Sequence, residues 1–425
     1  MCVLGQQEYT GLQKYLHNAA MEIEYYKTLF STHKTQAIVP DLSEFPLLTR
    51  QTVQHEHGRF FNGRSKRYPE IGHLLIKRSF GPSGVPLEVY WDDRDDARSQ
   101  AFLWAYRKER FGISDDDKHC IFCTADYSGN KIMDYLPQYL SWDEKTLLFT
   151  TLDLSPEILR ACLEKIIAFD PAWIILPPSI ALMIVETIKL NRMSLPSSLR
   201  HLEFYGETLD TQMEIMLQDF FRVQTSNVYT TQATGAVAAS CMHGHLHVFS
   251  GNVVVEVIRA GKPVVNEEGD VYITSLQNTA MPLVRLKTGD RGLLQSEPCS
   301  CGQSAPILSI THEKDHYFIT SASGRKISAS MLRSLVEFAN EEVSRCIAYI
   351  QFRQIAHDSF DVILGVKPAF AGWEEEVTRV FCEQIRDTEL KQMRWNFFYI
   401  DTHNPYEPET SGCQFFELLD KVKKL

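Results

Sequence analysis

Residues 285–290 combine charged side chains with a glycine at a spacing suited to a polar ligand. They read RLKTGD and follow an apolar stretch with strand character. Because side chains alternate along a strand, Arg285 and Lys287 should share one face. Gly289 permits a sharp turn, which would present the carboxylate of Asp290 at its tip. Arg285, Lys287 and Asp290 are therefore candidate site residues.

Cysteine and histidine residues in the second half of the chain have a spacing typical of metal sites. Cys241 and His247 form a C-x5-H pattern, and Cys299 and Cys301 a C-x-C pattern. Three thiolates and one imidazole suit a closed tetrahedral zinc site. Isolated buried thiols are the alternative, and neighbouring histidines at alternate positions would let another one serve as the ligand. We expect a structural zinc here.

A second cysteine pair, Cys120 and Cys123, also has a metal-like spacing. It lies within an apolar strand predicted at 119–124, where the two thiols are expected to be buried in the sheet. We therefore do not predict a metal at this pair.

Two glycine-containing segments could contact a phosphorylated ligand. The first contains Arg78, Gly81, Ser83 and Gly84 and leads into a β-type run. Its backbone N–H groups could cradle a phosphate, although an ordinary hairpin turn accounts for the same residues.

The second segment places Gly206 and Glu207 directly after a strand predicted at 202–205. Ligands of α/β proteins bind at the carboxyl ends of the strands, which makes Glu207 a candidate. A solvent-facing turn acid is the alternative.

The order of predicted elements favours an α/β fold with largely parallel sheets. A helix is expected to begin within 8–35. Further elements are predicted as helix 102–109, strand 119–124, helix 156–169, strand 173–176, helix 179–190 and strand 202–205. Glycine turns between 241 and 310 indicate β structure, and a smaller α+β unit follows. We predict its elements as helix 331–340, strands 347–354 and 361–365, and helix 374–386.

The composition excludes several classes of protein. The chain has 425 residues, a formal net charge of −11 and ten cysteines. The negative charge argues against a nucleic-acid partner. The longest apolar run, 173–185, is too short for a membrane helix, and no secretory signal is recognised. Ten cysteines without such a signal indicate reduced thiols or metal ligands, so we expect a cytoplasmic protein without a membrane partner.

Taken in order, these segments resemble the motifs of the adenylate-forming acyl ligases and are similar to their phenylacetate–CoA ligase branch. The resemblance implies a large N-terminal core at 1–314, with α/β subdomains and a β-rich part at 241–310. It also implies a small mobile α+β C-terminal domain at 315–425. Asp290 would hold the ribose hydroxyls of ATP or an acyl adenylate, and Arg285 would assist the hinge. Residues implied to contact the nucleotide or acyl group are Arg78, Gly81, Ser83, Gly84, Gly206, Glu207, Tyr229, Thr231, Gln232 and Asp290.

The chain departs from the family pattern on the triphosphate side. Phe80 and Pro82 replace hydroxyl residues of the phosphate loop. Ala233 stands where the family has a glutamate that binds Mg²⁺, and a methyl group cannot ligate this ion. Cys413 occupies the position of the catalytic lysine, and a neutral thiol cannot stabilise a leaving pyrophosphate.

The favoured hypothesis is an enzyme that activates an aryl or acyl carboxylic acid as its adenylate. It would pass the acyl group to the thiol of CoA or of a carrier protein's phosphopantetheine, or to an amine. ATP or AMP and a structural Zn²⁺ would be its cofactors, and a homodimer is expected by analogy with the family. Two alternatives remain. One is a descendant that transfers or condenses a pre-activated acyl group, with Cys413 in a new role, and the other is a non-catalytic binding homologue.

Overall fold

The chain folds into two compact units. The computed structural model describes residues 6–31, 40–63, 74–80, 86–123, 139–141, 143–151, 154, 156–207, 209, 211–295, 297–311, 318–320, 326–328, 332, 335–336, 339, 342–343, 346–366, 368–386, 388–399 and 416–417. Unit 1 comprises Met1–Ser79, Leu87–Ser114 and Ser226–Glu313, and unit 2 comprises Phe80–Pro86, Asp115–Thr225 and Lys314–Leu425. The division into domains at 314 and 315 stays a prediction.

Unit 1 is built on antiparallel strands in the order β12-β11-β13-β14-β15-β10-β9-β8. They span β8 Gln224–Thr231, β9 Gly235–Ser240, β10 Leu246–Val248, β11 Val253–Arg259, β12 Lys262–Val264, β13 Glu268–Ser275, β14 Leu286–Gln295 and β15 Ile307–Ile310. Alternate valines of β11 (Val253, Val255 and Val257) pack with Val271 and Ile273 of β13 in one apolar cluster. This alternation is the reason that the segment forms strands, and the β structure predicted for 241–310 is confirmed.

The helices of unit 1 are α1 (Gln6–Glu22), α2 (Glu24–Phe30), α3 (Arg50–His55) and α4 (Asp93–Phe111). The helix expected to begin within 8–35 is present as α1, and the chain leaves the helical conformation at Ile23, whose extended backbone forms a bridge to Asn62. Asp92 caps the start of helix α4 and accepts a hydrogen bond from the Arg94 N–H, and Gly112 caps its end in the left-handed region. Both residue types are favoured at these helix ends.

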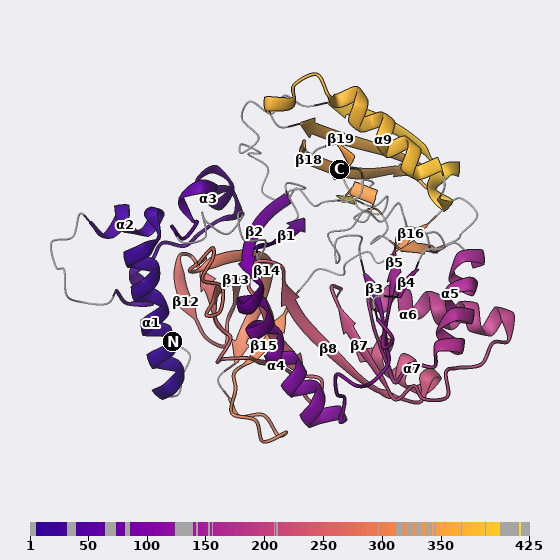
Figure 1. The fold of residues 1–425 in the computed structure, drawn as a ribbon, viewed down its shortest axis with the longest axis horizontal. Coiled ribbons are helices and arrows are strands. Elements are labelled where there is room, and N and C mark those ends of the chain that lie inside the picture. The colour runs from indigo at the N-terminus through magenta and orange to yellow at the C-terminus, as the bar shows by residue number, and fades with distance from the viewer. Residues whose placement is uncertain are drawn as a thin grey trace. The chain divides into compact units, whose positions relative to one another are not determined.

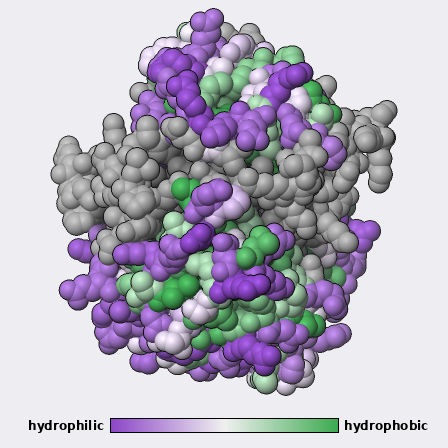
Figure 2. Space-filling model, turned by 90° about the vertical axis from the view of Figure 1, so that its right-hand side faces the viewer, coloured by the Kyte–Doolittle hydropathy of each residue, from purple (hydrophilic) through white to green (hydrophobic). Residues whose placement is uncertain are grey.

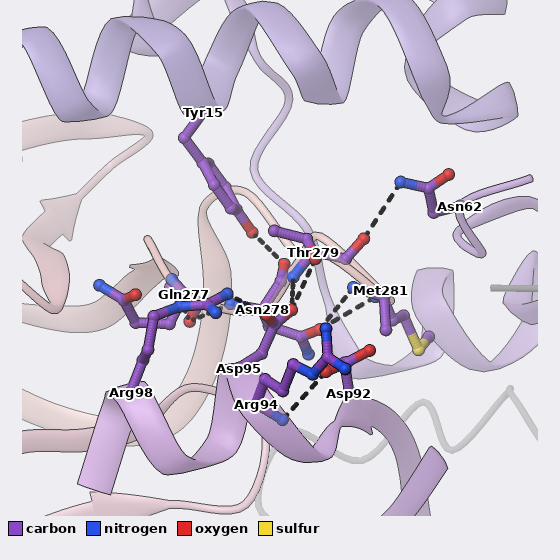
Figure 3. A network of polar contacts seen from close by, with 12 residues as sticks. Tyr15, Asn62, Asp92, Arg94, Asp95, Arg98, Gln277, Asn278, Thr279 and Met281 are labelled. Atoms are coloured by element: carbon purple, nitrogen blue, oxygen red, sulfur yellow. Dashed lines mark hydrogen bonds and ion pairs between the residues drawn. The ribbon is translucent and has the colours of Figure 1, made fainter. Parts of the chain in front are cut away.

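A buried polar network holds the loop that leads from β13 to β14 (Figure 3). Tyr15 Oη of α1 donates to the Asn278 carbonyl at 2.9 Å, and Asn278 Nδ2 donates to the carbonyl of Tyr90 at 3.1 Å. The Asp95 carboxylate of α4 accepts from both N and Oγ1 of Thr279 at 2.6 Å. Because Tyr15, Asn278 and Asp95 are buried, losing the partner of one of them would leave an unpaired polar atom. The network therefore fixes the entry to β14.

Unit 2 contains a mainly parallel sheet covered by helices. Its strands are β3 (His119–Cys123), β4 (Tyr139–Ser141), β5 (Thr146–Thr150), β6 (Trp173–Leu176) and β7 (His201–Tyr205), in the order β7-β6-β3-β5-β4. Helices α5 (Pro156–Phe169), α6 (Pro178–Asn191) and α7 (Thr211–Phe221) pack in one apolar core with β3, β5, β6 and β7 (Figure 1). The helices expected at 156–169 and 179–190 and the strand at 173–176 are confirmed, as is the α/β fold.

The C-terminal part of unit 2 has its own apolar core, which includes Phe352, Phe360 and Phe381. Its strands are β18 (Ile347–Ala356), β19 (Ser359–Val366), β20 (Arg394–Tyr399) and β21 (Phe416–Glu417), in the order β20-β19-β18-β21. Helix α9 (Glu374–Arg386) packs in the same core, and β16 (Phe318–Thr320) pairs antiparallel with β17 (Lys326–Ser328) in a separate sheet. The predicted strands at 347–354 and 361–365 and the helix at 374–386 are confirmed.

The face of the molecule drawn in Figure 2 mixes hydrophilic and hydrophobic residues. Among the apolar residues of α6 and α7, Leu190, Ile215 and Met216 are exposed. Within the described part of the chain, no helix has both the length and the apolar content needed to cross a membrane.

Candidate functional site

Tyr229 of β8 and Asp290 of β14 meet in unit 1. Tyr229 Oη donates a hydrogen bond to Asp290 Oδ2 at 2.5 Å. Burial raises the pKa of Tyr229, and the charge of Asp290 raises it further. The phenol therefore stays protonated at neutral pH and acts as the donor. The structure thus brings together two residues that the sequence assigned to the same ligand.

A bulge in β14 orients Asp290. Three consecutive residues, 288–290, lie opposite the single residue Val271 of β13. Gly289 has φ +99°, which side-chain-bearing residues rarely adopt. Thr288 Oγ1 donates to the Val271 carbonyl at 3.2 Å and accepts from the Asp290 N–H at 3.0 Å. The expected turn tip is wrong, because the strand continues through this point, but the glycine does redirect the aspartate.

Arg285 is held by the fold. It has φ +56° and directly precedes β14. Its Nε and Nη2 each donate to a carboxylate oxygen of Glu256 at 2.9 Å, and Nη1 donates to the carbonyls of Phe45 and Ser43 at 3.0 and 3.3 Å. A buried bidentate ion pair is thus a sufficient reason for an arginine at this position. Its catalytic role stays a prediction.

Lys287 lies on the same sheet face as Arg285, as expected. Glu256, Tyr272 and Lys287 are direct neighbours across β11, β13 and β14, and Arg285 binds Glu256. Lys287 Nζ pairs with Asp270 Oδ2 at 2.8 Å, and both side chains are about one third exposed. This lysine therefore remains accessible to solvent, and its catalytic role stays a prediction.

Arg50, the first residue of α3, lies within the electrostatic influence of Asp290 and was not anticipated from the sequence. The Leu48 N–H donates to the Arg285 carbonyl and the Lys287 N–H donates to the Leu48 carbonyl, both at 2.9 Å, which joins the start of α3 to β14. Burial lowers the pKa of Arg50 to about 10, and the negative charge of Asp290 opposes this shift. The sequence signals nothing here, because the contact depends on a bridge between segments far apart in the chain.

The loop between β8 and β9 closes on itself and on β2 (Pro86–Asp92). Thr231 Oγ1 lies 2.8 Å from Thr234 Oγ1 and accepts from the Thr234 N–H at 2.9 Å. Trp91 Nε1 donates to the Gln232 carbonyl at 3.1 Å. Ala233 is buried in an apolar cluster that contains Trp91. With a methyl group among apolar neighbours, the residue at 233 does not fit Mg²⁺, which requires oxygen ligands.

In unit 2, Glu207 holds the start of α6. Its two carboxylate oxygens accept from the N–H and the hydroxyl of Ser179, each at 2.9 Å. A carboxylate at a helix N-terminus is favourable because it satisfies N–H groups and opposes the helix dipole. Gly206 has φ +76°, which lets the chain turn there. The predicted contact of these residues with a ligand stays a prediction.

The remaining phosphate-loop candidates are only partly described. Arg78 belongs to β1 (Leu74–Phe80), and its Nε donates to Glu88 of β2 at 2.9 Å. Other predicted site residues lie outside the described residues, namely Gly81, Ser83, Gly84 and Cys413. Cys120 and Cys123 are both buried in β3, as expected for structural thiols.

The four predicted metal ligands converge in unit 1. The ligand atoms of Cys241, His247, Cys299 and Cys301 all lie within 4.8 Å of one another. Cys241 Sγ is 3.8 Å from Cys299 Sγ, and Cys301 Sγ is 3.3 Å from His247 Nε2. Ligand atoms around a tetrahedral zinc are about 3.5–3.8 Å apart, given the usual bond lengths. The donor set and its spacing therefore fit zinc.

Neighbouring groups hydrogen-bond to the predicted ligands in a way that favours binding of a cation. His247 Nδ1 lies 3.0 Å from the Ala305 carbonyl, so Nδ1 is the donor and Nε2 is left to bind a metal. Three backbone N–H groups point at the cysteine sulfurs at 3.4–3.5 Å. The backbone N–H of Cys301 is the main cause that lowers the pKa of the Cys299 thiol to about 5, and the His245 side chain is the second. His245 Nδ1 is 3.3 Å from Cys299 Sγ, so this histidine is a neighbouring potential ligand.

Comparison with known proteins places the chain by fold. A 2-hydroxyisobutyryl-CoA ligase in complex with 2-HIB-AMP and CoA, in its thioesterification state, matches with a TM-score of 0.61 and 14% identity over 99% of this chain and 91% of that one. An open conformation of the same ligase matches with a TM-score of 0.57 and 14% identity, over 95% and 89% of the two chains. No protein-family model matches the chain, and no curated protein does. The chain therefore has the fold of this CoA ligase.

Proposed function

We propose that this chain activates a carboxylic acid as its acyl adenylate and transfers the acyl group to a thiol or amine. The observation that carries the proposal is the hydrogen bond between Tyr229 and Asp290 in a chain with the fold of a CoA ligase. A carboxylate can accept hydrogen bonds from both hydroxyls of a ribose, and such charge-assisted bonds are strong. Asp290 would therefore hold the nucleoside half of the adenylate.

Within this proposal, the acid is aryl or acyl, as in phenylacetate–CoA ligases, and CoA or a phosphopantetheine arm accepts the acyl group. The support is the resemblance of the sequence motifs, together with a ligase of the same fold that has been solved with an acyl adenylate and CoA.

The surroundings of Ala233 favour a second candidate, in which the chain transfers an acyl group that is already activated. The loop 231–234 uses its hydroxyls within itself, and position 233 faces apolar side chains. Neither feature supplies oxygen ligands for a metal-bound triphosphate. A site for the nucleoside half alone would still serve a preformed adenylate.

The two candidates are separated by ATP–pyrophosphate exchange across a panel of aryl and acyl acids. Exchange that is lost in Asp290→Ala but kept in Glu267→Ala, an exposed acid paired with Arg259, supports acid activation. No exchange, with turnover of acyl adenylates or acyl thioesters, supports the second candidate. No turnover of any kind would refute both and leave a binding homologue.

We also propose that Cys241, His247, Cys299 and Cys301 bind a structural zinc ion. Zinc sites with four protein ligands have no open position for a substrate, so the ion would stabilise the fold. It would join the β9–β10 connection to the segment before β15.

A further inference from the structure

We propose that Tyr229 is a positioning residue of the nucleoside site, whose hydroxyl holds the Asp290 carboxylate in the orientation that accepts the ribose hydroxyls. The proposal rests on the proposed function, since it takes Asp290 as the ribose ligand. The sequence resemblance implies that Tyr229 contacts the nucleotide without saying which of its atoms acts. The structure assigns its hydroxyl to the ribose side of the site.

The ring of Tyr229 is held by the sheet. Tyr229 lies opposite Ala238 of β9 in the strand register. Its ring packs against the apolar cluster that contains Val253 and Val271. Side chains in such clusters are close-packed, so the ring has little freedom to move. The position of its hydroxyl is therefore set by the fold.

The bond from Tyr229 to Asp290 is a side-chain contact that strand pairing does not produce. Strands β15, β10 and β9 lie between β14 and β8 in the sheet. Tyr229 Oη nevertheless lies 2.5 Å from Asp290 Oδ2, as in a short bond between a hydroxyl and a carboxylate. The bond thus links two strands that are not neighbours in the sheet.

The backbone at Asp290 does not set the plane of its carboxylate. The bulge in β14 and the bond from the Asp290 N–H to Thr288 Oγ1 fix the main chain there. The bond from Cβ to the carboxylate carbon has a broad rotational preference, so these contacts do not define where the oxygens point. The Tyr229 donor at Oδ2 restricts this rotation. Loss of the hydroxyl should therefore weaken recognition of the ribose.

Competition between the phenol and the ribose for Oδ2 would have the opposite effect. The two oxygens of a carboxylate offer about four acceptor positions, and one bond from Tyr229 does not use them all. Asp290 is also partly exposed to solvent. Positioning and competition thus predict opposite signs for removal of the hydroxyl, which makes the two effects separable.

The test measures binding of adenosine and 2′,3′-dideoxyadenosine to the full chain by calorimetry, since the second compound lacks both ribose hydroxyls. The parent chain should prefer adenosine by about tenfold or more, the value of a hydrogen bond to a charged group. Tyr229→Phe keeps the ring and should lower this preference by about two- to tenfold, the cost of ordering a side chain on binding. Its affinity for the dideoxy compound should stay the same. In an Asp290→Asn background, Tyr229→Phe should change neither affinity.

Tyr106→Phe is the matched control. The phenol of Tyr106 lies in the same unit and donates to the Ser240 carbonyl at 2.7 Å. This variant also removes a phenol hydroxyl from a hydrogen bond, and its preference for adenosine should equal that of the parent chain. All affinities are measured below the thermal midpoints of the variants, so a loss of stability does not enter the comparison.

Three results would overturn the proposal. An unchanged preference in Tyr229→Phe would show that the hydroxyl does not act through Asp290. Tighter binding of adenosine by this variant would show that the phenol competes with the ribose. An equal loss of affinity for both nucleosides would give the hydroxyl a role in the fold or at the base. A parent chain that binds adenosine no better than the dideoxy compound, or not at all, would refute the proposed function itself, which distinguishes that failure from the other three.

Discussion

Replacing Arg285 with methionine should destabilise the chain by about 3–5 kcal/mol, the usual cost of removing one partner from a buried ion pair. The Arg285 side chain is 6% exposed and that of Glu256 is 14% exposed, so the remaining carboxylate cannot regain full hydration. Methionine keeps much of the aliphatic stem, so the loss is mainly that of the guanidinium. Two backbone carbonyls, of Phe45 and Ser43, lose a donor as well.

The loss of unfolding free energy caused by Arg285→Met should depend on pH in a defined direction. Burial raises the pKa of Glu256, and the hydrogen bond and charge of Arg285 lower it. A carboxyl with a raised folded-state pKa contributes stability that is present below its unfolded pKa and lost as the pH rises through the folded value. With methionine at 285 the two lowering effects of Arg285 are lost, so the pKa of Glu256 rises further. The destabilisation should be largest at neutral pH and shrink as the pH falls into the ordinary range of glutamate.

Urea unfolding followed by circular dichroism at pH 7 and pH 5 measures both effects. Lys287→Met is the matched control, because it removes a cation from the same sheet face but from a pair that is about one third exposed. Such a pair is worth about 0–1 kcal/mol. A penalty for Arg285→Met that equals the control, or that stays constant between the two pH values, would refute the structural role of Arg285.

Two further predictions concern other parts of unit 1. Chain purified without chelator should contain about one zinc per molecule, and Cys299→Ser should lower both the zinc content and the thermal midpoint; a parent content below about 0.2 equivalents would contradict the zinc site. Gly235→Ala should destabilise by about 1–3 kcal/mol, since a Cβ there would lie 2.1 Å from Ser99 Oγ at φ +77°. Adding Ser99→Ala should recover the steric part in urea unfolding, and an unchanged midpoint for Gly235→Ala would contradict this packing.

Elements with strong local signals could be predicted from the sequence. Helix 156–169 begins at a proline, which suits a first helical turn, and strand 173–176 is a short apolar run before two prolines. The end of the helix predicted to begin within 8–35 could not be located from the sequence, because the break at Ile23 follows from its bridge to Asn62. Such a contact between distant segments leaves no periodic pattern in the sequence.

The same limit applies to the candidate site. Tyr229 and Asp290 were identified because their segments resemble known motifs, and Arg50 was missed because no motif includes it. Residue type alone also cannot distinguish a ligand-binding charge from a structural one. Glu207 was selected as a charged residue near a strand end; the structure shows that its carboxylate accepts hydrogen bonds from Ser179 at the start of α6, and its contact with a ligand stays a prediction.

The surroundings of Ala233 explain why one half of the expected nucleotide site can change while the other half is kept. A glutamate at 233 would place a carboxylate in the apolar cluster around Trp91, where an unpaired charge costs several kcal/mol. One substitution therefore cannot restore the missing Mg²⁺ ligand. The Tyr229–Asp290 pair is held by the bulge in β14, a separate structural feature. On the proposed function, the ribose site and the Mg²⁺ position of the nucleotide site would thus depend on separate structural features, so a change at 233 would leave the Tyr229–Asp290 pair in place.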